Sequence, residues 1–266
     1  MQEPGSSIVN EDSNPPEMSL GGRLMNIYAA PTEVFDDIKV RPLQNANWLV
    51  PLLAVILVSI VSSMILYGQP AIIQGMKDAQ EKKYQQMVDS RKMSQKQADQ
   101  IMAMSESWMT PTVFRVVGIL GAFIGLPIML FISAGILWLL GRFALEGQFS
   151  YVKSLELVGL CLMISVPERI ISTLLAIIYG NSSITLGPVL LVGHFDPENK
   201  IHLLLAILNV FTLWGIALWA LGLARLTGKS FVKSLVVVAV CFFAIVAAVF
   251  GVAGALQKLG SAAGGK

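Results

Sequence analysis

Charged residues are scarce in this chain: Asp, Glu, Lys and Arg make up only 14% of its 266 residues, against about a quarter in a soluble domain. Hydrophobic residues make up 55%. The net charge of +2 does not indicate nucleic-acid binding, and no contiguous cluster of about four to eight basic residues marks a lipid-phosphate patch. This balance is typical of a chain that lies in a membrane.

Cysteine is also scarce, and both thiols, Cys161 and Cys241, fall within apolar stretches. A thiol in such a place is usually a small buried hydrophobe, so we expect neither a disulfide nor a metal site. The sequence lacks a Gly-rich phosphate loop, a nucleophile elbow and a paired-carboxylate arrangement. We therefore predict no catalytic residue, no cofactor and no enzyme activity.

The two histidines belong to the only group that has the donor types of a metal site. His194 and His202 flank Asp196 and Glu198, and such side chains can form a metal quartet. Their spacing matches no metal motif, however, and the Pro and Asn between them are typical of a turn. We favour the turn and predict no metal.

Five apolar stretches dominate the rest of the chain. Each reaches the roughly 20 residues that a spanning helix needs. Backbone groups in lipid must be paired within their own segment, and the alternation expected of barrel strands is absent. The sequence therefore predicts an all-α integral membrane bundle of five transmembrane helices, at about residues 48–67, 113–140, 154–179, 201–224 and 231–256.

The segments around these helices differ in composition. Residues 1–22 are acidic and contain prolines, which predicts a disordered tail and not a signal peptide. Residues 23–47 form an amphipathic interfacial segment, residues 48–257 the membrane domain, and residues 258–266 a C-terminal tail. The inner segments would hold eight Lys and Arg against three in the last two outer segments, which favours a cytoplasmic N-terminus, although the first outer loop adds six more.

That first outer loop, Gly68 to Thr112, carries apolar residues close to helical spacing, and Ser94 with Gln97 resembles a capping box. We expect a helical hairpin over residues 70–109 outside the membrane. Six of the twelve methionines lie here. A Met-rich face can form an adaptable binding surface, but packing within the hairpin or against the bilayer explains it equally.

The segment before the first crossing has two short amphipathic pieces, in which Pro31 suits the first turn of the second helix. Tyr28 and Phe35 lie on the apolar faces. We predict a lipid or partner surface at Tyr28, Pro31 and Phe35, either in the headgroup region or as a docking element for a cytoplasmic protein.

Polar residues interrupt the third stretch at Pro167, Glu168 and Arg169. Ionisable groups inside a membrane are costly unless they pair, reach water or face the bundle interior. Pro167 should also kink the helix and free the carbonyl four residues before it. Asn209 of the fourth stretch is a candidate partner. This site is either a substrate or ion pathway or a structural contact.

Two further patterns concern helix packing. Val152-Lys153-Ser154-Leu155 recurs at Val232-Lys233-Ser234-Leu235, which indicates a parallel repeat of two hairpins or convergent chemistry at helix starts. The spacing from Gly121 to Gly125 is Gly-x-x-x-Gly, which permits close helix approach. We expect packing within the chain there, with homo-oligomer contacts as the alternative.

Taken together, these features resemble the Yip family of membrane proteins, in particular its bacterial members. The residues that carry the resemblance are I-Y-A-A-P-T-E-V-F at Ile27 to Phe35, the five spanning stretches, Pro167 within the third, and W-A-L-G-L-A-R-L-T-G-K-S-F-V-K-S at Trp219 to Ser234. The resemblance covers roughly Leu24 to Leu256. It implies a five-helix protein with a cytoplasmic N-terminus and no catalytic residue.

Eukaryotic relatives in that family are implicated in vesicle traffic through Ypt and Rab GTPases. The acidic and glycine motifs of that branch are not evident here, so this role does not carry over. The resemblance places the chain in a bacterial cytoplasmic membrane.

Two functions remain open. The first is a non-enzymatic scaffold or adaptor, with the lipid bilayer, membrane or cytoplasmic proteins, or a second copy as partners, and no nucleic acid. The alternative is a small transporter or channel with its polar site at the kinked third helix.

Overall fold

The computed structural model describes residues 17–91, 93–193, 195–196 and 199–263, and every regular element in those ranges is a helix. Five helices are long and apolar enough to cross a membrane, namely Ala46–Leu66, Pro111–Ala144, Tyr151–Tyr179, Val210–Thr227 and Phe231–Val252. The expected all-α membrane bundle is therefore confirmed.

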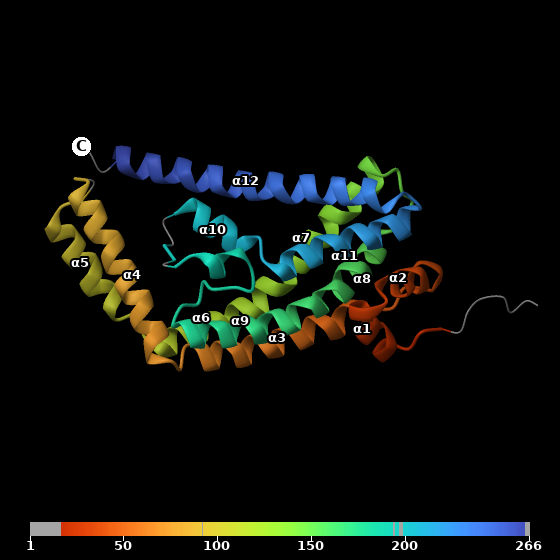
Figure 1. Ribbon diagram of the computed structural model, residues 1–266, viewed down its shortest axis with the longest axis horizontal. Helices are drawn as coiled ribbons and strands as arrows, with labels where there is room; N and C mark the ends of the chain where they lie inside the picture. Colours follow the sequence, from red (N-terminus) through yellow and green to blue (C-terminus); the bar gives the residue numbers. More distant parts are fainter. Residues whose placement is uncertain (1–16, 92, 194, 197–198, 264–266) are drawn as a thin grey trace, which may run out of the picture.

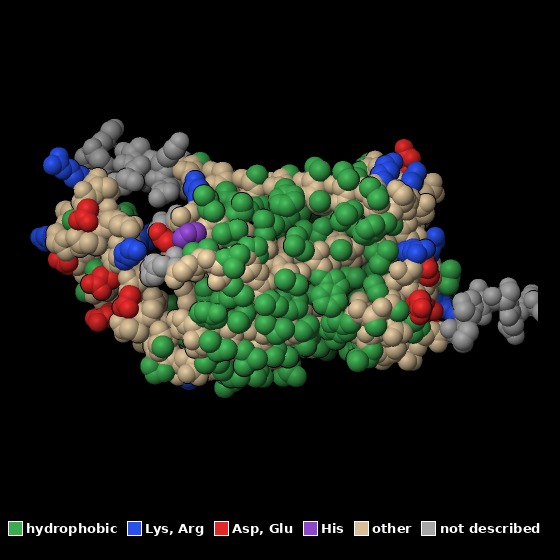
Figure 2. Space-filling model, viewed as in Figure 1, with side chains coloured by type: hydrophobic (Ala, Val, Ile, Leu, Met, Phe, Trp, Pro, Cys, Tyr) green, Lys and Arg blue, Asp and Glu red, His purple; other side chains and the backbone are tan. Residues whose placement is uncertain are grey.

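The crossing helices run along the long axis of the molecule (Figure 1). At one end lies a pair of short helices, α1 (Leu20–Ala29) and α2 (Pro31–Val40). At the other end the hairpin of α4 (Pro70–Asp89) and α5 (Gln95–Glu106) projects away from the bundle. Figure 2 shows a broad hydrophobic belt between two charged ends, as expected of side chains that face lipid.

The first crossing is one continuous helix, whereas the second and third have irregular turns within them. The first is α3 (Ala46–Leu66). The second consists of α6 (Pro111–Leu120), a π-helical turn, α7 (Leu126–Leu139) and a second π-helical turn. The third joins α8 (Tyr151–Cys161) to α9 (Ser165–Tyr179) through one 3₁₀ turn. That turn comes just before Pro167, which lies in the first turn of α9.

The fourth apolar stretch is not one helix, as the sequence predicts, but two. It divides into α10 (Lys200–Ile207) and α11 (Val210–Thr227). The Asn209 side chain caps α11 by accepting the N–H of Thr212 at 2.9 Å. The N–H of Val210 donates at 3.0 Å to the carbonyl of Leu186, which lies in the connection after α9. This bond to another segment takes the place of a helical one, which explains the break.

Both predicted tails are shorter than expected where the structure describes them. Residues 1–16 lie outside the described residues. After them α1 begins at Leu20, because the Ser19 hydroxyl accepts the N–H of Gly22. The fifth helix, α12 (Phe231–Ala263), continues past residue 256, so most of the predicted C-terminal tail is helical.

The N-terminal segment, predicted to be interfacial, turns its apolar faces toward the bundle. Ile27, Val34, Phe35 and Ile38 are at most 1% exposed and belong to the main hydrophobic core. Their partners come from α3, α8 and α11. The apolar faces of α1 and α2 are therefore covered by the bundle itself and not by lipid headgroups.

Some glycines permit close helix contacts, but not the predicted pair. A Cβ on Gly159 would lie 2.3 Å from the Trp48 Cα, and one on Gly222 would lie 2.5 Å from Leu157. A Cβ on Gly121 or Gly125 would meet nothing within 4 Å. The Gly-x-x-x-Gly spacing therefore makes no close contact within the described chain.

Candidate functional site

A buried charged network joins the N-terminal helices to the bundle. Its centre is Arg23 of α1, whose side chain is only 1% exposed. The Arg23 Nε donates to Asp37 Oδ2 at 2.8 Å, and Nη1 donates to Gln44 Oε1 at 2.6 Å and Asn47 Oδ1 at 3.2 Å. Nη2 lies 3.3 Å from Glu17 Oε1. The guanidinium therefore links α1, α2 and the start of α3.

The second half of the network surrounds Glu156 of α8, which is fully buried. Its Oε1 accepts the Gln44 backbone N–H at 2.6 Å and the Asn47 side-chain amide at 2.9 Å. The Lys153 Nζ lies 2.7 Å from Oε2 and donates to the Arg41 carbonyl at 3.1 Å. Because Gln44 and Asn47 contact both Arg23 and Glu156, the two charges are compensated through shared polar groups.

Asp37 shows the effect of this setting on titration. Burial raises the pKa of Asp37. Hydrogen bonds from Arg23, Arg41 and the Met18 N–H lower it, and so does the positive charge of Arg23. Together these contacts outweigh burial, so the pKa lies below its usual value. The carboxylate is thus held ionised, as expected when charged donors surround it.

Tyr28 connects the same N-terminal unit to the irregular third crossing. Its hydroxyl donates to the Met163 carbonyl, and burial raises the pKa of Tyr28. Met163 is four residues before Pro167, which has no N–H to offer this carbonyl. The carbonyl that the sequence predicts to be freed is therefore satisfied by α1. The Tyr28 ring also packs edge-on against Trp214, with centroids 6.1 Å apart.

The predicted intramembrane polar residues are partly brought together. Asn209, at the break between α10 and α11, lies close to Glu168, although its side-chain amide donates to the Ala206 carbonyl at 3.3 Å. Glu168 is half-buried, whereas Arg169 is exposed. The Gly159 contact aligns the third crossing with Trp48 near the start of α3. Glu168 lies about 14 Å further along a helix axis, which is near the middle of a hydrocarbon layer about 30 Å thick.

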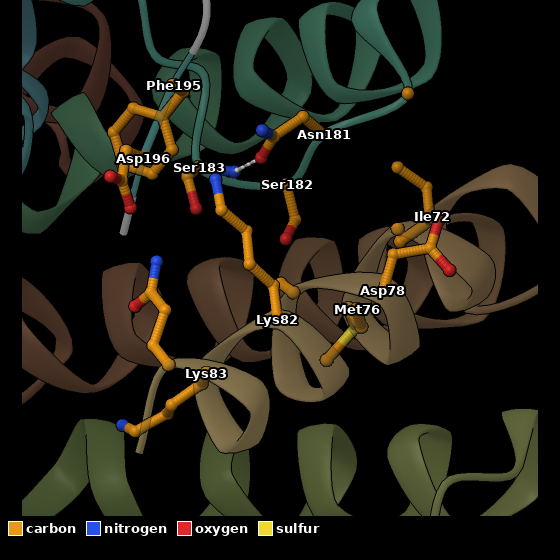
Figure 3. A pocket seen from close by; sticks show the side chains of 14 residues that line it. Ile72, Met76, Asp78, Lys82, Lys83, Asn181, Ser182, Ser183, Phe195 and Asp196 are labelled. Carbon is orange, nitrogen blue, oxygen red and sulfur yellow. Dashed lines mark hydrogen bonds between the residues drawn. The ribbon is translucent and has the colours of Figure 1, made fainter. Parts of the chain in front are cut away.

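A separate pocket of about 590 Å³ lies at the opposite end, between α4 and the connections that follow α9. In Figure 3 Lys82 extends from α4 toward Ser183, whereas Lys83 points away. Asn181 accepts the Ser183 N–H at 2.9 Å. Within the described part of the chain no group of three or more His, Cys, Asp and Glu side chains could hold a metal. His194 and Glu198 lie outside the described residues.

A comparison with protein families matches the Yip1 domain over residues 25–265, which is nearly the whole chain. The chain belongs to the Yip1 domain family. No curated protein and no solved structure matches it.

The family match therefore includes the second half of α1, all of α2 and the five crossings. The I-Y-A-A-P-T-E-V-F segment spans the junction of α1 and α2, where Pro31 opens α2. Phe35 has no exposed surface, so the predicted contact surface at Tyr28, Pro31 and Phe35 needs correction. Phe35 packs inside the molecule, whereas Tyr28 and Pro31 are only partly buried.

Sequence reasoning missed the charged network of this Yip1 domain. Glu156 lies within a stretch that otherwise looks like a spanning helix, three residues after Lys153. That spacing puts both side chains on one helix face. The unusual acidic residue in an apolar run was the available signal, but nothing in the sequence connects it to Arg23.

Proposed function

We propose that this Yip1 domain protein is a non-enzymatic membrane scaffold or adaptor that presents the outer face of α1 and α2 to partner proteins. The observation that carries this is the network from Arg23 to Glu156, which fixes the two helices to the bundle. A platform of fixed geometry binds without an ordering cost at each encounter. The charged groups of the network pair with each other and do not line the pocket described above, which supports a structural role over a catalytic one.

The contact face that we propose lies on the side of the pair that the bundle leaves uncovered. Met25 of α1 and Val40 of α2 are 69% and 60% exposed. Both are large apolar side chains, flanked by the exposed charges of Glu33 and Lys39. Apolar groups rimmed by polar ones are a frequent feature of protein interfaces.

The membrane of a bacterium, with this end in the cytoplasm, is the location that we propose. Arg142, Arg225, Lys229 and Lys233 lie in or near the connections at the α1–α2 end, and basic residues favour the cytoplasmic side. Partners would then be cytoplasmic or membrane proteins.

Crosslinking in cells, followed by purification and identification of the captured proteins, tests the scaffold. We expect Met25→Glu and Val40→Glu to lose the proteins that the unmodified chain captures. Met104→Glu, at an exposed position on α5, is the matched control and should keep them. The same captured set for all variants would reject the proposed face, provided that the variants fold.

One observation favours a second candidate function, a small transporter or channel. The fourth apolar stretch is interrupted at Asn209, which caps α11 and lies close to Glu168. Interrupted helices near the bilayer midplane form substrate sites in transporters. Solute or ion flux into liposomes, measured with Glu168→Gln and Arg169→Gln, tests this. A flux abolished by Glu168→Gln would support transport, and a flux insensitive to both would remove these residues from the mechanism.

A further inference from the structure

A pocket at the α1–α2 end collects basic side chains from separate parts of the chain. Its volume is about 330 Å³, and Lys39 of α2, Arg225 of α11 and Lys229 of the following connection line it. Asp36 is the one carboxylate among its described lining residues. The remaining lining residues are Leu221, Ala224, Gly228 and Phe231. Three cationic groups and a single carboxylate leave the pocket positively charged.

The basic side chains of the pocket have N–H groups that could donate to an anion. Arg225 Nη1 lies 3.7 Å from Asp36 Oδ2, and within the described part of the chain its guanidinium makes no hydrogen bond. Lys39 has no ion pair with any described residue. Lys229 Nζ is 2.9 Å from Glu146 Oε2, an exposed carboxylate outside the pocket. A guanidinium with free N–H groups is well suited to the oxygens of a phosphate.

The pocket lies where the membrane surface should be. The fourth candidate span ends at Thr227 and the fifth begins at Phe231, so the connection between them crosses the headgroup level. Phe231 and Val232, at the start of α12, are exposed large apolar side chains. A lipid could therefore place its phosphate in the pocket and its acyl chains along the first turns of α12.

We propose that this pocket binds the phosphate of an anionic phospholipid headgroup in the leaflet at the α1–α2 end. Lys39, Arg225 and Lys229 contact the phosphate oxygens. The carboxylate of Asp36 repels negative charge, so it disfavours headgroups that carry more negative charge than one phosphate. The inference is independent of the scaffold role, since a lipid can bind here whether or not α1 and α2 recruit a protein.

A simpler explanation of the same residues needs no ligand. Basic residues near the last turn of α11 stabilise the negative end of its dipole, and basic connections favour one side of the membrane. Neither effect gives saturable binding that distinguishes one headgroup from another. The experiment must therefore measure saturation and headgroup selectivity.

The test is a titration of the purified protein in detergent, at fixed ionic strength, with the thermal unfolding midpoint as the readout. The added probes are dioctanoyl phosphatidylglycerol, dioctanoyl phosphatidylcholine and inorganic phosphate. We expect a saturable increase of the midpoint with phosphatidylglycerol alone. The Lys39→Gln/Arg225→Gln variant should bind it about tenfold or more weakly, since each basic group near a membrane surface attracts anionic lipid.

Matched variants separate the site from general charge. Lys77→Gln/Lys82→Gln in α4 removes the same charge at the far end and should leave the phosphatidylglycerol affinity unchanged. Asp36→Asn should raise that affinity. If the first double variant does not fold, Lys39→Gln alone gives the comparison, because its side chain has no described ion pair to lose.

Three results would overturn the proposal: equal affinity in the unmodified protein and the Lys39 variants, equal effects of phosphatidylcholine and phosphatidylglycerol, or a midpoint increase that inorganic phosphate alone reproduces. The last would assign the pocket to free phosphate. Loss of binding in the Lys39 variants, with retention in the α4 control, would support the lipid site.

Discussion

At the scale of single residues, the contact between Gly159 and Trp48 determines how deeply the third crossing lies against the first. A side chain at position 159 would overlap the Trp48 backbone, which cannot move aside like the end of a flexible side chain. Gly159 is therefore required for close approach and not for an unusual backbone angle.

We expect Gly159→Ala to destabilise the protein by about 1–3 kcal/mol, the usual cost of overpacking. Thermal or denaturant unfolding in detergent checks this. Gly215→Ala is the control, because a Cβ there meets nothing within 4 Å and alanine favours a helix over glycine. Equal stability of Gly159→Ala and the unmodified protein would mean that α3 and α8 are not in this contact.

The pKa of Asp37 gives a pH-dependent prediction. The folded-state pKa is lowered by its hydrogen bonds and the Arg23 charge, despite burial. The unfolded value is about 3.9. Asp37 therefore contributes stability above pH about 4, and this contribution is lost as the pH falls through the lower folded-state value.

We expect Asp37→Asn to reduce stability by about 1–3 kcal/mol at pH 7, where it removes the acceptor of charged donors. The difference from the unmodified protein should shrink as the pH falls below about 4, because Asp37 is protonated first in the unfolded chain and then, through its lower folded-state pKa, in the native protein. Unfolding midpoints from pH 7 to pH 3 measure this. Asp78→Asn on the exposed face of α4 should differ little at any pH, and a pH-independent deficit for Asp37→Asn would contradict the linkage.

At the scale of helices, the long apolar stretches were predictable, whereas their breaks and contacts were not. Pro167 and its freed carbonyl could be predicted from local chemistry, because proline lacks an N–H. The break at Asn209 could not, since it depends on the Leu186 carbonyl, which lies elsewhere in the chain. The Arg23 network likewise depends on Glu156, and residues this far apart in sequence meet only after the bundle has formed.

The two copies of the Val-Lys-Ser-Leu repeat differ in the residue that follows them, and the difference matches what each copy contacts. Ser150 caps the N–H of Lys153 and Ser230 caps that of Lys233, each at 3.3 Å. The first copy is covered by α1 and α2, and Glu156 there accepts their hydrogen bonds. The equivalent position in the second copy is Val236, which is 56% exposed. A carboxylate facing lipid without partners would be costly.

Glu156 is the buried acceptor through which α8 holds Gln44, Asn47 and Lys153. Glu156→Ala would leave Lys153 and two N–H donors without their buried acceptor. Breaking a buried ion pair in this way costs about 3–5 kcal/mol. We expect α1 and α2 to detach before the bundle unfolds, with faster trypsin cleavage after Lys39.

Limited proteolysis followed by mass spectrometry measures this detachment. Glu106→Ala, at the end of the exposed helix α5, is the control and should leave the cleavage rate unchanged. Slow cleavage at Lys39 in Glu156→Ala, equal to that of the unmodified protein, would show that apolar packing of residues such as Phe35 holds the pair without the charges.

At the scale of the whole molecule, five crossings place the two ends of the bundle in different compartments. The single crossing α3 separates the pair of α1 and α2 on one side from the hairpin of α4 and α5 on the other (Figure 1). The buried network and the basic pocket belong to the first side, and the larger pocket beside α4 belongs to the second. Partner docking and lipid binding would thus act in the same compartment.

The sidedness can be measured with single cysteines in a Cys161→Ala/Cys241→Ala background. We expect cysteines placed at Lys39 and Lys229 to react with a membrane-impermeant thiol reagent only in inverted vesicles, since basic connections favour the cytoplasm. A cysteine at Lys82 should react only in intact cells. Opposite labelling of all three would reverse the orientation, but keep the pocket and the N-terminal pair together. Labelling of positions 39 and 229 from different sides would contradict the bundle itself, because α2 and the α11–α12 connection line one pocket.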